Sequence, residues 1–170
     1  MGLGQMLLTI LAIAMLGTLM LTVNTNTMDS GQAIEQSEYR IMATSLGISM
    51  LERANGLSFD ENTLASDVSV PTSLTSSLGR ETGETAGKDS TYDDFDDYQS
   101  HDRWILGNAI TFRSADYHLW STVDYVGVTG DSVKTSASRT FHKRIRIWVS
   151  SPFMQDTLQF QSVYSYWYFR

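Results

Sequence analysis

Residues 1–29, MGLGQMLLTILAIAMLGTLMLTVNTNTMD, contain no charged side chain before Asp29. Within them, the eighteen residues from Met6 to Val23 are all apolar, Gly or Thr. A helix that crosses a membrane needs about 20 such residues, and the residues just before this stretch supply the difference. A secretory signal peptide would instead have a basic start and an apolar run of about 7–15 residues. The stretch therefore predicts an apolar helix that is buried in a membrane or in an assembly.

The first basic residue of the chain is Arg40, so no positive charge near the apolar stretch fixes its orientation in a membrane. The missing basic flank is explained if a peptidase has removed a segment upstream. We therefore expect Met1 to be the first residue of a processed chain.

Residues 29–55 continue the helical pattern but place their apolar side chains on one side. Ile34, Ile41 and Ile48 recur at a spacing of seven residues, and Leu51 follows three residues later. This spacing predicts an amphipathic helix, and the glycine that comes next is a helix stop signal. We expect these four side chains to pack against the rest of the chain.

Residues 1–56 thus predict one helical spine of roughly 80 Å, apolar over 1–28 and amphipathic over 29–55. Gly17, Gly31 and the Asn/Thr run between them are points where the helix is expected to bend or melt.

The remaining residues, 57–170, predict a globular head with a long acidic loop over 57–103 and a β-sheet over 104–170. A short helix or strand near Leu64–Val70, ended by Pro71, is the one regular element expected in the loop. The later part is rich in β-branched and aromatic residues, in stretches at 104–112, 117–128, 143–151 and 157–169. Residues 129–139 are expected to form a turn or a mobile hairpin loop.

The clearest strand signal is the alternation in KRIRIWVSS, where Ile145, Ile147 and Val149 share one face. Four such strands joined by short connections predict an antiparallel meander, one face of which must be covered. The amphipathic half of the helix is the expected cover, so the fold class is α+β.

Composition excludes several classes of function. The formal net charge is −7 and the pI is near 4.8, which argues against general affinity for nucleic acids. There is no cysteine, and hence no disulfide, thiolate metal site or cysteine nucleophile. The charge is uneven: residues 60–102 hold eleven acids and two bases, whereas 103–170 hold four acids and eight bases. These two halves are expected to attract each other within or between subunits.

An acidic run, YDDFDDY, ends the predicted loop. Its aspartates offer a candidate calcium site, because Ca²⁺ prefers clustered carboxylates on a loop; the candidate ligands are Asp93, Asp94, Asp96 and Asp97. The EF-hand pattern is absent, however, and charge runs are usually solvated. Pairing with a basic residue is favoured over calcium; the candidate partners are Arg139, Lys143, Arg144 and Arg146.

Catalytic signals are weak. The three histidines stand in unrelated contexts without metal-ligand spacing, and no Gly-x-Ser-x-Gly motif occurs. We expect no enzymatic activity and no cofactor, calcium excepted. The aromatic ending favours a ring-filled sheet over a role in adhesion or electron transfer.

The order of these features resembles the type IV pilin and pseudopilin family: Met1-Gly2-Leu3-Gly4-Gln5, the apolar run, the amphipathic continuation, the acidic run and the late sheet. The resemblance implies a leader peptidase, N-methylation of the new terminus, storage in the inner membrane and polymerisation with copies of itself. The residues it assigns to assembly are Met1, Gln5, Leu7, Leu8, Leu11, Leu16 and Leu19.

Family members commonly carry a glutamate where this chain has Gln5. That carboxylate is thought to pair with the amino terminus of a neighbouring subunit, and Gln5 can accept a hydrogen bond but cannot neutralise an ammonium. The resemblance implies a structural subunit of an extracellular type IV pilus-like filament. The alternatives are a minor pilin or pseudopilin of a secretion machine and a single membrane-anchored surface domain.

Overall fold

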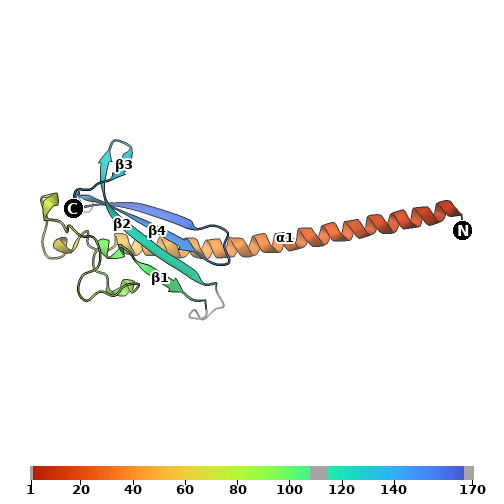
Figure 1. Ribbon diagram of the computed structural model, residues 1–170, viewed down its shortest axis with the longest axis horizontal. Coiled ribbons are helices and arrows are strands. Elements are labelled where there is room, and N and C mark those ends of the chain that lie inside the picture. Colours follow the sequence, from red (N-terminus) through yellow and green to blue (C-terminus); the bar gives the residue numbers. More distant parts are fainter. Residues whose placement is uncertain (1, 108–114, 167–170) are drawn as a thin grey trace. The chain divides into compact units, whose positions relative to one another are not determined.

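The structure is a computed structural model that describes residues 2–107 and 115–166. The chain divides into two compact units, Met1–Glu38 and Tyr39–Arg170, and helix α1, Leu3–Asn55, contributes to both (Figure 1). Helix α1 ends at Asn55, next to the predicted end of the spine at residue 56, whereas the two compact units divide within the helix, after Glu38. Residues Tyr39–Asn55 of the helix belong to the second unit because Ala43, Met50 and Ala54 among them pack into its core.

The first unit is helical from Leu3 onwards. Hydroxyl groups of Thr9, Thr18 and Thr22 donate hydrogen bonds to main-chain carbonyls one turn back, at 2.8–2.9 Å, as expected for Thr in an apolar helix. The helix is not interrupted at Gly17 or Gly31, so the expectation of a melted segment there is wrong. Thr25, Thr27 and Ser30 add further hydroxyl-to-carbonyl bonds in this stretch.

The second unit contains an antiparallel sheet. Its strands are β1 (Asp102–Ile105), β2 (Tyr117–Thr129), β3 (Ser132–Thr135), β4 (His142–Ser150) and β5 (Leu158–Ser165). The order is β1-β2-β4-β5, every neighbouring pair is antiparallel, and β3 pairs with the end of β2 (Figure 1). The predicted α+β fold with an antiparallel sheet is confirmed.

Two strand predictions need adjustment. The strand expected over 104–112 begins earlier, at Asp102, and its second half falls on residues 108–114, which lie outside the described part of the chain. The loop expected over 129–139 contains β3, because Gly130, with φ +58, allows a tight turn back onto β2.

The inner face of the sheet forms the main core. Ile145, Ile147 and Val149 are fully buried, as their alternation predicted. The second half of α1 covers this face, so the predicted cover is confirmed. Its buried residues are Ala43, Gly47, Met50 and Ala54.

The helix face that meets the sheet is not the predicted one. Ile41 and Ile48 are 70% and 44% exposed, and Ile34, in the first unit, is 61% exposed. Leu51 alone of the predicted set packs on the core. Small residues face the sheet because the approach is close: a β-carbon at Gly47 would lie 2.5 Å from Cδ2 of Phe160.

The segment 57–103 is more ordered than its composition predicted. It holds four short 3-10 helices, η1 (Glu61–Thr63), η2 (Pro71–Ser73), η3 (Asp89–Thr91) and η4 (Asp96–Tyr98). Pro71 begins η2 rather than ending an element, because proline suits the first position of a helix. Phe95 and Tyr98 from this segment are fully buried beside the sheet.

Candidate functional site

The first unit presents an uncharged surface of large apolar side chains, which we call the apolar helix surface. The leucines assigned to assembly are 56–70% exposed: Leu7, Leu8, Leu11, Leu16 and Leu19. Nine more large apolar side chains of the stretch are 57–79% exposed: Leu3, Met6, Ile10, Ile13, Met15, Met20, Leu21, Val23 and Met28. Soluble monomers rarely expose so continuous an apolar surface, so we expect a partner beyond the described residues to cover it.

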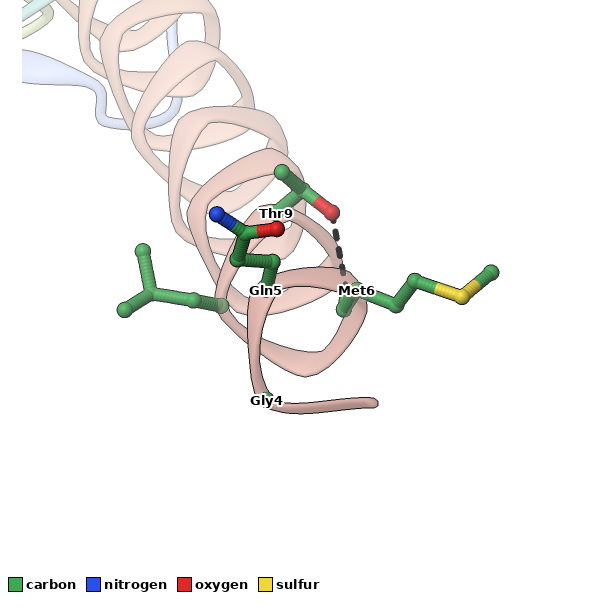
Figure 2. Close-up of a pocket in the computed structure, with 5 residues that line it drawn as sticks. Gly4, Gln5, Met6 and Thr9 are labelled. Atoms are coloured by element: carbon green, nitrogen blue, oxygen red, sulfur yellow. Dashed lines mark hydrogen bonds between the residues drawn. The ribbon is translucent and has the colours of Figure 1, made fainter. Parts of the chain in front are cut away.

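The start of this surface is uncharged in its side chains. Figure 2 shows the residues around Gln5 that line a pocket at the start of α1; among the described residues these include Gly4, Met6 and Thr9. Thr9 Oγ1 donates a hydrogen bond of 2.8 Å to the carbonyl of Met6, whereas the side-chain amide of Gln5 is exposed. Gln5 is thus available to hydrogen-bond outside its own helix. Met1 lies outside the described residues.

The helix satisfies the physical requirements of a membrane span. An 18-residue window near its start has a mean hydropathy of 2.4, and none of that window is buried within the protein. Length and composition alone therefore allow α1 to cross a membrane.

The head contains buried charges, which we call the acidic centre: Asp60, Asp94, Asp96, Asp97 and Lys143. All five are fully buried. Lys143 Nζ lies 2.8 Å from Asp60 Oδ2, donates to the carbonyl of Phe59 at 2.7 Å, and is also paired with Asp96. The predicted pairing of the acidic run with Lys143 is confirmed through Asp96. The expectation that the run is solvated holds for Asp93 and is wrong for Asp94, Asp96 and Asp97.

The two carboxylates paired with Lys143 differ in environment. Burial raises the pKa of Asp60, but Lys143 and the hydrogen bonds from Thr75 outweigh it, so the pKa of Asp60 is lowered. Tyr125 donates a further hydrogen bond of 3.1 Å to Asp60. Asp96 has fewer donors, and burial outweighs the attraction of Lys143, so the pKa of Asp96 is raised.

The carboxylates of Asp94 and Asp97 accept hydrogen bonds from main-chain N–H groups of η4 and of the residues just before it. Asp94 Oδ1 accepts from the N–H groups of Asp96 and Asp97 at 2.8 and 3.2 Å. Asp97 Oδ2 accepts from those of Asp93 and Asp94, both at 3.0 Å. Their other oxygens, Asp94 Oδ2 and Asp97 Oδ1, are buried without a hydrogen-bond partner. Burial and the nearby Asp96 raise the pKa of Asp94 to about 9, so it is protonated at neutral pH.

The structure corrects the candidate calcium ligands. Asp96 pairs with Lys143, Asp94 bonds to the main chain, and Asp93 is exposed, so the four aspartates do not converge. Alternate residues of a tight turn point in different directions, which a run of letters does not reveal. In the described part of the chain, the carboxylates close enough to hold an ion are those of Glu81, Glu84 and Asp97. Burial, followed by the charge of Asp97 or a hydrogen bond to it, raises the pKa of Glu81 and of Glu84 to about 7.

The other predicted bases have different partners. Arg139 donates to the carbonyl of Leu74 at 2.8 Å. Arg144 and Arg146 lie on the outer face of the sheet, where both pair with Asp124. Burial raises the pKa of Asp124, but hydrogen bonds from Arg144 and Thr135 outweigh it, so its pKa is lowered.

The histidines occupy three separate settings. His101 is buried and its Nδ1 lies 3.0 Å from the hydroxyl of Tyr92; burial lowers its pKa. His118 stacks between Trp104 and Trp120 on the outer sheet face. His142 Nδ1 lies 2.7 Å from Ser165 Oγ. No arrangement among these described groups identifies a catalytic centre.

Two rings of the aromatic ending, those of Tyr164 in β5 and Tyr166 just after it, pack inside the head, in line with the prediction of a ring-filled sheet. Tyr164 packs against Phe59 and Phe95, and Tyr166 against Phe59 and Phe141. Trp167, Tyr168 and Phe169 lie outside the described residues.

Sequence reasoning missed Asp60, Glu81 and Glu84. A signal for Asp60 was present, since Asp60 and Thr63 form a capping box at η1. Glu81 and Glu84 are three residues apart in a Gly-rich stretch, and nothing local indicates that Asp97 lies beside them.

Comparison with known proteins returned no match: no protein-family model, no curated protein and no solved structure is significantly similar to this chain. What the chain does must therefore be inferred from the apolar helix surface and the acidic centre.

Proposed function

We propose that this chain is a structural subunit of an extracellular helical filament of the type IV pilus kind, built by side-by-side packing of its N-terminal helices. The observation that carries the proposal is the apolar helix surface, in which fourteen large apolar side chains are more than half exposed. The chain contains nothing that covers them within the described residues, and copies of the same helix are chemically suited to do so.

The driving force for such packing is large. Each Å² of apolar surface removed from water contributes about 25 cal/mol, and a fully buried Leu or Ile about 1.5–3 kcal/mol. Before assembly, a membrane would also remove these residues from water, because α1 has the length and hydropathy of a span. A subunit that is stored in a membrane and then extracted into a filament would bury this surface first in lipid and afterwards against other subunits.

Gln5 is compatible with this proposal if a hydrogen bond replaces the ion pair of the resembling family. In the resembling family a carboxylate at this place is thought to pair with a neighbouring amino terminus. The exposed amide of Gln5 can accept a hydrogen bond from that terminus without adding a second buried charge. Assembly would then depend on apolar packing more than on ion pairing.

Two other functions use the same surface. A minor pilin or pseudopilin would prime or cap a short fibre, and the uncharged Gln5 is the feature that favours it. A single membrane-anchored surface domain would bury the helix in lipid permanently, and the continuity of α1 from Leu3 to Asn55 is compatible with it.

Electron microscopy of material sheared from cells that make the protein, with the subunit identified by mass, separates these functions. Long uniform fibres built mainly of this chain support the proposal. Trace amounts in fibres of another protein favour the minor subunit, and a chain that stays in the membrane fraction without fibres favours the anchor.

A matched pair of variants sharpens this experiment. Leu11→Glu places a charge within the apolar helix surface and should abolish fibres, whereas Gln155→Glu adds the same charge at an exposed turn of the head and should not. Fibres of normal yield from the Leu11 variant would contradict assembly through this surface.

A further inference from the structure

Three carboxylates of the segment 57–103 lie close together in the head, those of Glu81, Glu84 and Asp97. Glu81 and Glu84 lie on one turn, in which the N–H of Glu81 donates to Glu84 Oε2 at 2.8 Å. Asp97 comes from η4, and one carboxylate oxygen from each of the three residues lies within 4.8 Å of the others. Ionised carboxylates at such distances repel strongly unless a proton or a metal cation lies between them.

Asp97 provides an independent indication that something is bound. Its side chain is fully buried, and Oδ2 is satisfied by the two N–H groups of Asp93 and Asp94. Oδ1 is buried and receives no hydrogen bond from an N–H or hydroxyl group of the described residues, and the same holds for Glu81 Oε2 and Glu84 Oε1. The side chains of Glu84 and Asp97 share a hydrogen bond, which a proton held between the two carboxylates supplies. Burying carboxylate oxygens that no donor outside the cluster reaches is costly, and a cation that displaces this proton would compensate them.

The described part of the chain supplies no cation for these groups. The nearest basic residue along the chain, Arg80, directs its guanidinium to the carbonyls of Asp97 and Gln99, at 3.4 and 2.9 Å. None of the described ion pairs includes Glu81, Glu84 or Asp97. Lys143 pairs with Asp60 and Asp96 in the acidic centre. Among the described residues, no basic side chain plays the same part for Glu81, Glu84 and Asp97.

We propose that Glu81, Glu84 and Asp97 bind a calcium ion. Calcium is a hard cation that takes six to eight oxygen ligands at about 2.3–2.6 Å and tolerates irregular geometry. Three convergent carboxylates supply charge and oxygens, and the partial exposure of Glu81 and Glu84 lets water complete the shell. Magnesium demands a smaller, near-octahedral arrangement, which an irregular loop suits less well.

The ion would join two parts of the loop. Glu81 and Glu84 are on a turn, whereas Asp97 lies on η4 next to Asp96, which is anchored to Lys143. Calcium would therefore fasten the acidic loop to the sheet of the head. This role is independent of filament formation.

The test is calorimetric titration of the EDTA-treated full chain in detergent micelles with CaCl2, together with thermal unfolding with and without calcium. We expect binding of one ion per chain with Kd below about 1 mM and a higher Tm in calcium. No binding heat and no rise in Tm would overturn the proposal, and an equal response to MgCl2 would overturn the assignment to calcium.

The variant Glu81→Gln/Glu84→Gln keeps the size of both side chains, removes two charges, and replaces one acceptor oxygen of each carboxylate with an NH2 donor. We expect calcium affinity at least about tenfold weaker, no calcium-dependent rise in Tm, and a Tm in EDTA at or above that of the unmodified chain. Asp93→Asn, an exposed aspartate of the same acidic run, is the matched control and should bind calcium normally. Equal losses in both variants would show general charge attraction and overturn the site.

Discussion

The apolar helix surface and the acidic centre each reverse the usual distribution of residues, in opposite directions. In the first, large apolar side chains are exposed; in the second, Asp60, Asp96 and Lys143 are fully buried. Ordinarily, large aliphatic residues are inside and charges outside. The two regions differ in whether the groups that compensate these unusual side chains belong to the same chain.

Asp60, Asp96 and Lys143 of the acidic centre find their partners within the chain. Lys143 is satisfied by Asp60, Asp96 and the carbonyl of Phe59, so its burial is compensated locally. The leucines of the helix have no such partner in the described chain, so under the proposed function a membrane or other copies of the chain would bury them. Stability of the head and assembly of the chain should therefore be separable by mutation.

The largest effect is expected from Lys143→Met. The substitution leaves Asp60 and Asp96 buried without their cation, and breaking a buried pair in this way costs about 3–5 kcal/mol. Urea unfolding of the full chain in detergent, followed by circular dichroism of the sheet, measures it. Lys134→Met, at an exposed strand residue, is the control and should change little. An unchanged midpoint for the Lys143 variant would mean that the centre contributes nothing to stability.

A smaller loss is expected from Gly47→Ala, because the added methyl group would overlap the ring of Phe160. Overpacking of this kind costs about 1–3 kcal/mol, measured in the same unfolding experiment. Gly31→Ala makes the same change where nothing lies within 4 Å, and it should be neutral or stabilising by up to about 1 kcal/mol. If both variants behave alike, the close contact between helix and sheet is not a constraint.

Asp124→Asn should cost about 1 kcal/mol at pH 7, since it weakens the hydrogen bonds from Arg144 and Thr135. The folded pKa of Asp124 is below its unfolded value of about 3.9. Its stabilisation is therefore present above that value and is lost as the pH falls through the folded pKa. Unfolding at several pH values should show the two proteins converging in acid; a difference that is constant with pH would exclude an ionic origin.

The smallest effect on the head is expected from Leu11→Gln. Leu11 is 63% exposed, so the free energy of unfolding of the head should change by less than about 0.5 kcal/mol. Partitioning between membrane, fibre and soluble fractions should nevertheless shift toward the soluble fraction. A marked loss of head stability would show that the two regions are coupled.

Much of the fold was accessible from the sequence because its signals are local. The uncharged start predicted an apolar helix, and the alternation around Ile147 predicted a strand with one buried face. Both predictions depend on neighbours within one or two turns or along one strand. The candidate site was less accessible: only Asp97 of the predicted calcium ligands belongs to the cluster that the structure brings together.

The sequence by itself determined that α1 has an apolar half and indicated four of the five strands that the structure describes. Hydropathy and side-chain period carry that information residue by residue. Only the tertiary structure decided that Gly47 rather than Ile48 faces the sheet, and that Asp96 is buried against Lys143, 47 residues away. Which face packs, and which charges are buried, depend on contacts between distant segments, because the free energy of burial is set by the partner that each group meets.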